Sequence, residues 1–255
     1  MSIAQPDSGA VTPQSRSFLL VHGLNISPRA MDWIGLELRA RGHNTPLVQL
    51  SGHDGEFSHR TLASAARWKN DLALAAEKAK DFPRPLTILG YSLGGLLSAL
   101  AVKKGIIAPP DKLVLLSPAI GLRSWVRFFE PLTKILPQSL PLPSGVPARY
   151  RAARFAAVSW YRALFDIYHE LHADPGPGAL KDLPIEIVVS EGDEFIGVAE
   201  LRRWVAEASL SNVTFRFIRS KARLSPTPQH LLLEPEHFGE PEWGDWMMAL
   251  TNPHT

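Results

Sequence analysis

The run from Thr87 to Leu96 holds the residues of this sequence best suited to covalent chemistry. A short apolar stretch leads into Gly90-Tyr91-Ser92-Leu93-Gly94, and an apolar segment with helical spacing follows. A serine between a strand and a helix, with glycine two residues to either side, is typical of a nucleophile elbow, a turn too tight for larger side chains. The strained turn presents the hydroxyl at a helix N-terminus, where free N–H groups favour a developing negative charge. Ser92 is therefore the candidate nucleophile, and the alternative is a plain glycine-rich turn.

Alternating apolar strands and helices surround this serine along the chain. A continuous apolar run, of the kind buried on both faces of a parallel sheet, predicts a strand at 17–21. Further strands are expected at 46–50, 87–89, 113–116, 185–189 and 213–218. Helices are expected at about 28–42, 61–80, from residue 96 onward, 198–210 and 241–250. The pattern predicts an α/β fold with a doubly wound, mainly parallel sheet of about six strands.

The segment 120–182 interrupts this alternation, because no strand is expected in it. Two apolar helical runs flank a proline-rich stretch at 137–147, and the segment ends in Pro175-Gly176-Pro177-Gly178. An insertion after the carboxyl end of a strand lies above the edge where such sheets bind ligands. We therefore predict a helical cap at 120–182, inserted after the fourth strand of a core formed by 17–119 and 183–255. The alternative is a segment that fills one side of the core.

Composition excludes several other classes of protein. The 255 residues carry a formal net charge of +2, and Lys and Arg are scattered, so no nucleic-acid partner is expected. The absence of cysteine excludes disulfides, thiol nucleophiles and thiolate metal sites. Residues 1–16 are polar and are expected to form a flexible tail, not a signal peptide. The sequence predicts a cytoplasmic protein without cofactor, metal or stable membrane insertion.

Five short motifs follow one another along the chain: Leu20-Val21-His22-Gly23-Leu24, Leu50-Ser51-Gly52-His53, Gly90-Tyr91-Ser92-Leu93-Gly94-Gly95, Leu115-Leu116-Ser117-Pro118-Ala119 and Glu191-Gly192-Asp193-Glu194-Phe195-Ile196. Through these motifs, which stand in the family's order, the sequence from residue 17 onward resembles the α/β-hydrolase superfamily, in particular its small capped bacterial serine carboxylesterases, monoglyceride lipases and lysophospholipases. The family usually begins with an additional antiparallel hairpin, for which residues 1–16 are too few and too polar, so the resemblance implies a shortened sheet.

Serine chemistry also needs a carboxylate that orients a base, and N–H donors for the oxyanion. The resemblance points to Asp193 as the acid, because it follows a strand at the same sheet edge as the serine. Glu191 and Glu194 flank it as alternatives, and Asp193 could also be a simple turn residue. The backbone N–H groups of Leu24 and Leu93 are the expected oxyanion donors.

Three histidines follow Asp193 and could act as the base. His254 lies in the C-terminal tail. His230 lies some ten residues after the last predicted strand, in the kind of loop that carries the family's catalytic histidine, so it is favoured over His237. The alternative for His230 is a surface histidine, because the preceding residues are polar and proline-rich.

Further residues around the serine are candidates for substrate contact. The aromatic residues of the insertion suggest an apolar pocket. The basic residues of the insertion either cover solvated helix faces, which we favour, or bind an anionic substrate; they are Arg123, Arg127, Arg149, Arg151, Arg154 and Arg162. The expected substrate-binding residues are Asn25, His53, Tyr91, Trp125 and Phe129. Asn25 could instead cap the helix that follows it, and a structural role in the loop is the favoured alternative for His53.

The resemblance implies a serine hydrolase that cleaves small-molecule esters with an apolar acyl or aryl group through an acyl-enzyme. Serine at the nucleophile position argues against dehalogenase and epoxide hydrolase chemistry, which needs an aspartate there. Acyl transfer and thioester, amide or C–C cleavage with the same triad are alternatives, because they depend on pocket shape and water access. A non-catalytic binding protein with this fold is a further alternative.

Overall fold

Six parallel strands form the centre of the computed structural model, which describes residues 15–54, 63–219 and 229–252. The strands follow the order β2-β1-β3-β4-β7-β8 across the sheet, and each neighbouring pair is parallel. The prediction of an α/β fold with a six-stranded, mainly parallel sheet is confirmed. The bounds of the strands are Ser17–Val21 (β1), Leu47–Val48 (β2), Leu86–Tyr91 (β3), Lys112–Leu116 (β4), Ile185–Ser190 (β7) and Val213–Ile218 (β8).

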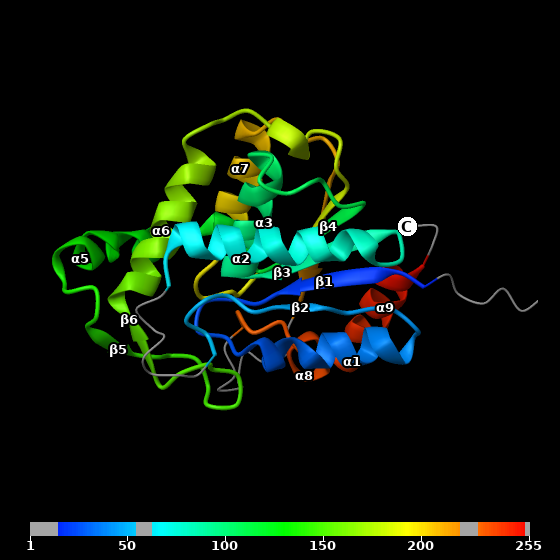
Figure 1. Cartoon of the computed structure of the whole chain (residues 1–255), viewed down its shortest axis with the longest axis horizontal. Helices are drawn as coiled ribbons and strands as arrows, with labels where there is room; N and C mark the ends of the chain where they lie inside the picture. Colours follow the sequence, from blue (N-terminus) through cyan, green and yellow to red (C-terminus); the bar gives the residue numbers. More distant parts are fainter. Residues whose placement is uncertain (1–14, 55–62, 220–228, 253–255) are drawn as a thin grey trace, which may run out of the picture.

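Helices cover both faces of the sheet (Figure 1). On one face lie α2 (Ala65–Lys78), α3 (Leu93–Lys103), α6 (Val158–His172) and α7 (Val198–Glu207). On the other lie α1 (Asp32–Ala40), α8 (Pro235–Phe238) and α9 (Glu240–Thr251). Alternate residues of β1 enter the two buried clusters, Leu19 and Val21 in one and Phe18 and Leu20 in the other. This division explains why β1 is a continuous apolar run.

Several elements differ in extent from the sequence prediction. The second strand is only two residues long, and α1 is preceded by a short 3-10 helix at Pro28–Met31. The described part of the long second helix begins at α2, where the side chain of Ser64 caps it by accepting the Arg67 N–H at 3.2 Å. Thr61, the predicted start, lies outside the described residues, but Ala63 and Ser64 are described and precede the helix, so the prediction that it spans them is wrong.

The insertion at 120–182 contains a β-hairpin that the sequence analysis did not expect. Strands β5 (Pro141–Pro143) and β6 (Phe155–Ala157) pair antiparallel, so the prediction that this segment has no strand is wrong. Strands of three residues, one of them with proline at both ends, give no alternation that a periodicity argument can detect. The last helical run accordingly begins at Val158, because Phe155 belongs to β6.

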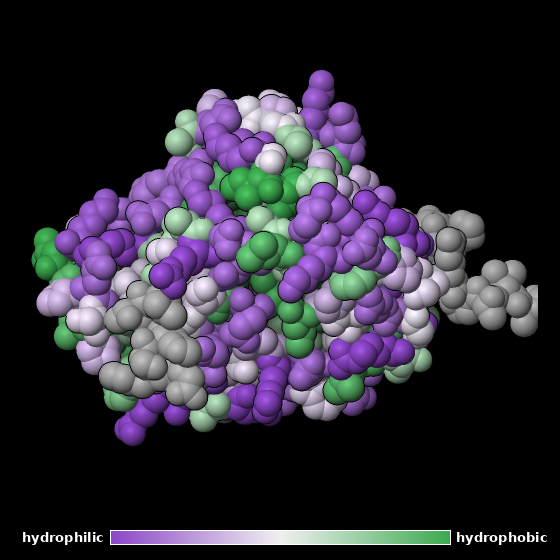
Figure 2. All heavy atoms as spheres, in the orientation of Figure 1, coloured by the Kyte–Doolittle hydropathy of each residue, from purple (hydrophilic) through white to green (hydrophobic). Residues whose placement is uncertain are grey.

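The helices of the insertion are buried to very different degrees. α6 packs against α2 and α3, and most of its apolar residues join the buried cluster of that face. The short helices α4 (Ser124–Phe128) and α5 (Glu130–Ile135) instead expose Phe128, Leu132 and Ile135 by 78%, 45% and 77%. Figure 2 shows hydrophobic side chains at the outer left edge, where Figure 1 places α5. The cap stays a prediction, and α4 with α5 is the part of the segment that fits it.

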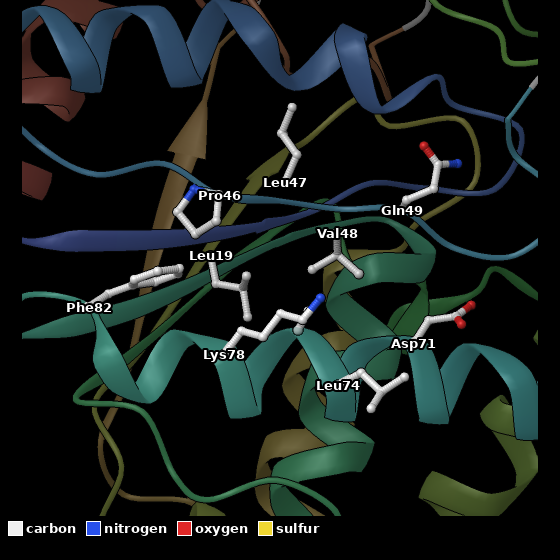
Figure 3. Close-up of a pocket in the computed structure, with 10 residues that line it drawn as sticks. Leu19, Pro46, Leu47, Val48, Gln49, Asp71, Leu74, Lys78 and Phe82 are labelled. Carbon is white, nitrogen blue, oxygen red and sulfur yellow. The ribbon is translucent and has the colours of Figure 1, made fainter.

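A hollow of about 340 Å³ lies between β2 and α2 (Figure 3). Its apolar walls include Leu19, Val48 and Leu74, and its polar ones include Lys78 and Asp71. The Asp71 carboxylate accepts the backbone N–H of Ser51 at 2.7 Å. Neither Ser92 nor any other predicted site residue lines this hollow.

Two further predictions concern the N-terminal tail and membrane insertion. Residues 1–14 of the expected N-terminal tail lie outside the described residues. The backbone of Arg16 donates to His43 Nδ1 at 3.3 Å and accepts from Asn44 N–H at 2.8 Å, so residue 16 is attached to the core. None of the helices in the described ranges has the length and hydropathy that a bilayer crossing demands.

Candidate active site

Ser92 lies between β3 and α3 with its backbone in a strained conformation. Its φ is +51° and its ψ is −112°, which for a residue with a side chain costs on the order of 1–3 kcal/mol. Backbone hydrogen bonds hold the turn in place. The Ser92 N–H donates to the Leu116 carbonyl at 2.9 Å, and the Ser92 carbonyl accepts the N–H groups of Leu96 and Ala119. The hydroxyl is thereby presented at the N-terminus of α3, as the elbow motif predicts.

Glycines are required where the loop after β1, the elbow and α3 meet. A Cβ on Gly94 would lie 2.2 Å from the carbonyl oxygen of Val21, and one on Gly90 would lie 2.6 Å from the carbonyl oxygen of Gly94. A Cβ on Gly23 would lie 3.1 Å from the Cβ of Ser92. The glycine spacing therefore reflects close backbone packing that brings the loop after β1 against the nucleophile.

Gly94→Ala is expected to destabilise the protein by about 3 kcal/mol, the upper end of the usual cost of overpacking, since a clash with backbone cannot be relieved by a side-chain rotation. Urea unfolding measures this loss. The matched control is Gly244→Ala on α9, where an added Cβ meets no atom within 4 Å and a helical Gly→Ala change is favourable. Equal stability of the two variants would contradict the close packing at Gly94.

A continuous chain of hydrogen bonds joins Ser92 to Asp193 through His230. Nε2 of His230 lies 3.0 Å from Ser92 Oγ, and Nδ1 lies 2.9 Å from Oδ2 and 3.1 Å from Oδ1 of Asp193. Because an ionised carboxylate only accepts, Nδ1 carries the proton and Nε2 can accept from the serine hydroxyl. The structure thus brings together the three residues that the sequence predicted, from the ends of β3 and β7 and from the segment after β8.

Asp193 is buried, and three hydrogen-bond donors surround its carboxylate. Oδ1 accepts the N–H groups of Phe195 and Ile196, each at 2.9 Å, in addition to His230. Burial raises the pKa of the Asp193 carboxyl, but the charge and hydrogen bond of His230 and the two N–H groups outweigh burial, so the pKa lies below its usual value. Asp193 is therefore ionised at neutral pH and able to orient the imidazole.

Two other side chains hold the backbone of His230, a role that the sequence analysis did not assign. The Glu194 carboxylate accepts the N–H of Gln229 at 2.8 Å and that of His230 at 2.9 Å. The Tyr91 hydroxyl donates to the His230 carbonyl at 3.1 Å. Burial, reinforced by the charges of Asp193 and Glu194, raises the pKa of Tyr91 well above its usual value, so the hydroxyl stays a donor. The adjacency of Glu194 to Asp193 was a sequence signal for the first of these contacts.

The two expected oxyanion donors flank Ser92. Leu93 is the first residue of α3, and Leu24 follows Gly23 in the loop that packs against Ser92. Among the hydrogen bonds of the described residues, none uses the N–H of Leu24 or Leu93 as its donor. Both groups can therefore donate to a negative charge that develops beside the serine.

Asn25, His53 and Tyr91, predicted to contact substrate, are 3%, 1% and 1% exposed. The Asn25 amide binds both backbone groups of Ala153, and Nε2 of His53 accepts the Asn25 N–H at 3.0 Å. With Tyr91 bonded to His230, the polar groups of all three are taken up by protein partners. They support the loops around Ser92.

Trp125 and Phe129, the other predicted substrate contacts, are exposed on the site's outer side. They are 47% and 51% exposed, and Trp125 Nε1 donates to the Glu194 carbonyl at 3.1 Å. Phe195 contacts both Trp125 and His230: its ring centroid is 5.7 Å from that of Trp125 and 5.2 Å from that of His230. An aromatic path therefore leads from α4 to the imidazole.

His237, the alternative base, lies away from Ser92 on α8. It is 4% exposed, and among the described residues neither ring nitrogen has a hydrogen-bond partner; Nδ1 is 3.9 Å from Glu234 Oε1. Burial lowers the pKa of His237 to about 4, and burial likewise lowers that of His22 to about 4. The third histidine considered, His254, lies outside the described residues.

The buried neutral histidines predict a loss of stability in mild acid. Below about pH 6.5 the unfolded chain binds protons at His22 and His237 that the folded chain takes up only near pH 4, so the free energy of unfolding falls as pH falls through this window. Each site contributes about 3 kcal/mol across the window. Urea unfolding at several pH values between 7 and 4 measures the slope.

His237→Phe removes one of these two titrating sites. The free energy of unfolding of this variant should therefore depend less steeply on pH, by the share that His237 contributes. The control is Phe238→Leu, which alters a neighbouring buried side chain without a titratable group and is expected to leave the slope unchanged. A His237→Phe variant that lost stability as steeply as the wild type would contradict this origin of acid sensitivity.

Within the described ranges, no group of three His, Cys, Asp or Glu side chains is arranged to hold a metal ion.

Comparison with known sequences assigns the chain to a family. Residues 18–246 match the sequence model described as the alpha/beta hydrolase family. The chain belongs to the α/β-hydrolase family. The match begins at the second residue of β1 and includes the other strands of the described residues, together with Ser92, Asp193 and His230. No curated protein sequence matches the chain at a significant level.

Solved structures share the fold of this α/β hydrolase at low sequence identity. A soluble variant of monoglyceride lipase from Saccharomyces cerevisiae, in complex with a substrate analogue, is 14% identical with a TM-score of 0.71, over 92% of this chain and 86% of that one. The monoacylglycerol lipase of Paleococcus ferrophilus is 17% identical with a TM-score of 0.65, over 93% and 95%. Est1E from Butyrivibrio proteoclasticus, with ferulic acid bound, is 17% identical with a TM-score of 0.56, over 81% and 80%.

Proposed function

We propose that this α/β hydrolase cleaves carboxylic esters through an acyl-enzyme formed on Ser92. The observation that carries the proposal is the hydrogen-bonded series from Ser92 Oγ through His230 to the buried Asp193 carboxylate. A serine held in a strained turn, an imidazole nitrogen 3.0 Å from the serine oxygen and a carboxylate that orients the imidazole are the parts that acyl transfer requires.

The proposed reaction uses His230 as base and then as acid. Nε2 takes the hydroxyl proton as Ser92 Oγ attacks the ester carbonyl, and the resulting oxyanion accepts N–H bonds from Leu24 and Leu93. The intermediate collapses with cleavage of the C–O bond, and His230 returns the proton to the leaving alcohol. A water molecule, deprotonated by His230, then attacks the acyl-enzyme, and the acid leaves as Ser92 regains its proton.

We propose an apolar acyl or aryl group as the substrate part that contacts the insertion. The exposed rings of Trp125, Phe129 and Phe195 form an apolar surface that ends at His230. In this proposal α4 and α5 belong to the cap predicted for residues 120–182 and lie beside the acyl-binding side of the site. Apolar contact with few polar anchors is the usual way in which such groups are bound.

Several arginines of the insertion are engaged by the protein itself, which supports a neutral substrate over an anionic one. Arg123 Nε donates to the Asp193 carbonyl at 2.9 Å, and Arg162 Nε donates to the Thr133 carbonyl at 3.0 Å. Arg149 pairs with Glu234 at 2.8 Å. The names of the similar structures, which include monoglyceride lipases and esterases, support an ester over an amide or thioester.

The test is the hydrolysis of p-nitrophenyl butyrate and p-nitrophenyl palmitate by the purified protein, with Ser92→Ala as the reference. We expect turnover of at least one ester, and the ratio of kcat/KM between them reports how long an acyl chain the site accepts. Absence of turnover of both esters and of 1-monooleoylglycerol would contradict the proposed function.

A further inference from the structure

Two histidines connect the loop after β1 to the loop after β2 in a reciprocal way. His22, on the first loop, accepts the N–H of Leu50 at 3.2 Å through Nε2. His53, on the second loop, accepts the N–H of Asn25 at 3.0 Å through Nε2. Each loop thus supplies an imidazole that binds the backbone of the other, and the two rings lie 4.9 Å apart.

Both imidazoles must be neutral and in one tautomer to make these bonds. An Nε2 that accepts an N–H carries no proton, so the proton of each ring lies on Nδ1. Nδ1 of His22 donates to the Gly23 carbonyl at 2.9 Å, and Nδ1 of His53 faces the Ser51 carbonyl at 3.4 Å. Burial, and for His53 also the nearby His22, lowers the pKa of both rings, which keeps them neutral at neutral pH.

Asn25 attaches the same loop to the insertion. Its φ is +54°, a left-handed value that Asn tolerates better than most residues. Its amide donates to the Ala153 carbonyl and accepts the Ala153 N–H, both at 2.9 Å, and its own carbonyl accepts the Ala152 N–H at 2.9 Å. With the bond to His53, all polar groups of Asn25 are used.

The insertion also fixes the second histidine. The His53 ring stacks on Trp160 of α6, with centroids 4.3 Å apart and planes at 29°, and lies 5.6 Å from the ring of Trp68 on α2. The residue between His22 and Asn25 that remains partly accessible is Leu24, one of the two proposed oxyanion donors. The residues on either side of Leu24 in this loop are therefore hydrogen-bonded to buried groups: His22 binds Leu50, and Asn25 binds His53 and Ala153.

We infer that His22, Asn25 and His53 form a brace that holds the Leu24 N–H at the distance from Ser92 at which it stabilises the oxyanion. They are positioning residues, since their polar atoms bind backbone and face no reacting atom. The inference rests on the proposed serine mechanism, and it assigns to α6 and residues 152–153 of the insertion a role in catalysis apart from any cap function. An oxyanion donor contributes only when its geometry is fixed before charge develops.

The experiment compares His53→Phe, His53→Gln and Asn25→Gly with the wild type. His53→Phe keeps an aromatic ring against Trp160 but removes the acceptor, whereas glutamine retains an acceptor near the position of Nε2. Asn25→Gly keeps the left-handed backbone and removes the bonds to Ala153. The readouts are kcat, KM, the pH profile, and the inhibition constant of an alkyl trifluoromethyl ketone, whose serine adduct carries an oxyanion.

We expect His53→Phe and Asn25→Gly to lower kcat about 10- to 100-fold, because displacing a donor costs less than deleting it. KM is expected to change less than about three-fold, and ketone affinity to fall by the same factor as kcat/KM. His53→Gln should recover most of the loss. The pH profile should keep its shape, since His230 and Asp193 are untouched.

Wild-type kcat in Asn25→Gly, or a fall in kcat/KM with unchanged ketone affinity, would overturn the brace. Asn25→Gly decides the question by itself where His53→Phe does not fold. The proposed function fails separately: it fails when Ser92→Ala hydrolyses esters as fast as the wild type, whatever the brace variants do.

Discussion

Ser92→Ala is expected to lower kcat/KM for p-nitrophenyl butyrate by at least about 10⁴-fold, which is the scale of loss when the nucleophile of a serine triad is removed. The expectation follows from geometry: Ser92 Oγ is the hydroxyl that lies 3.0 Å from His230 Nε2 and beside the proposed N–H donors. The residual rate should come from the oxyanion site and His230 acting on water.

The change should alter activity without loss of the fold, because alanine removes only the hydroxyl. Melting temperature serves as the measure, and it should stay equal or rise slightly once a polar atom at a strained turn is gone. Ser211→Ala, an exposed serine ahead of β8, is the matched control and should retain full activity. Esterase activity of Ser92→Ala above one tenth of the wild-type rate would contradict the assignment.

His230→Ala is expected to lower kcat by about 10⁴-fold or more, because it removes both the base for Ser92 and the acid for the leaving group. His230 is also the group through which Asp193 acts, so adding Asp193→Asn to His230→Ala should cause little further loss. Stopped-flow or steady-state ester kinetics over pH 5–9 measure the effect.

His237→Phe provides the contrast within the same region of the sequence. Because His237 is buried on α8 without contact to Ser92, this variant should keep kcat within about three-fold of the wild type while changing stability in acid. The reverse result, an active His230→Ala and an inactive His237→Phe, would exchange the two roles.

Strong local patterns allowed much of the fold and site to be predicted from the sequence. β1 was predicted with its observed bounds from a continuous apolar run, which indicates a buried parallel strand. β8 was also predicted with its observed bounds, although Thr214 and Arg216 interrupt its apolar residues and the strand lies at the sheet edge. The elbow at Ser92 follows from glycines whose absence of Cβ is required by backbone contacts below 3 Å. Asp193 follows the carboxyl end of β7 and His230 lies in the segment after β8, and parallel strands bring their carboxyl ends to one edge.

The remaining features depend on contacts between distant segments, which carry no periodic signal. Each strand of the β5–β6 hairpin is only three residues long, and β5 begins and ends with proline. The brace joins positions 22, 25 and 53 with residues 152–153. Because these partners lie far apart along the chain, the residues next to His22, Asn25 or His53 in the sequence do not indicate which group each of them binds. Tyr91 and Glu194 could be placed against the backbone of His230 only once the loop after β8 was positioned.

The most direct test of the account is the site and stoichiometry of labelling by an alkyl fluorophosphonate. The account predicts one adduct per chain, located by peptide mass spectrometry on Ser92, with ester turnover lost in proportion to labelling. Labelling should be abolished in Ser92→Ala and greatly slowed in His230→Ala. Ester turnover that continues at the wild-type rate in a protein with no adduct, or with the adduct on another residue, would contradict an acyl-enzyme on Ser92.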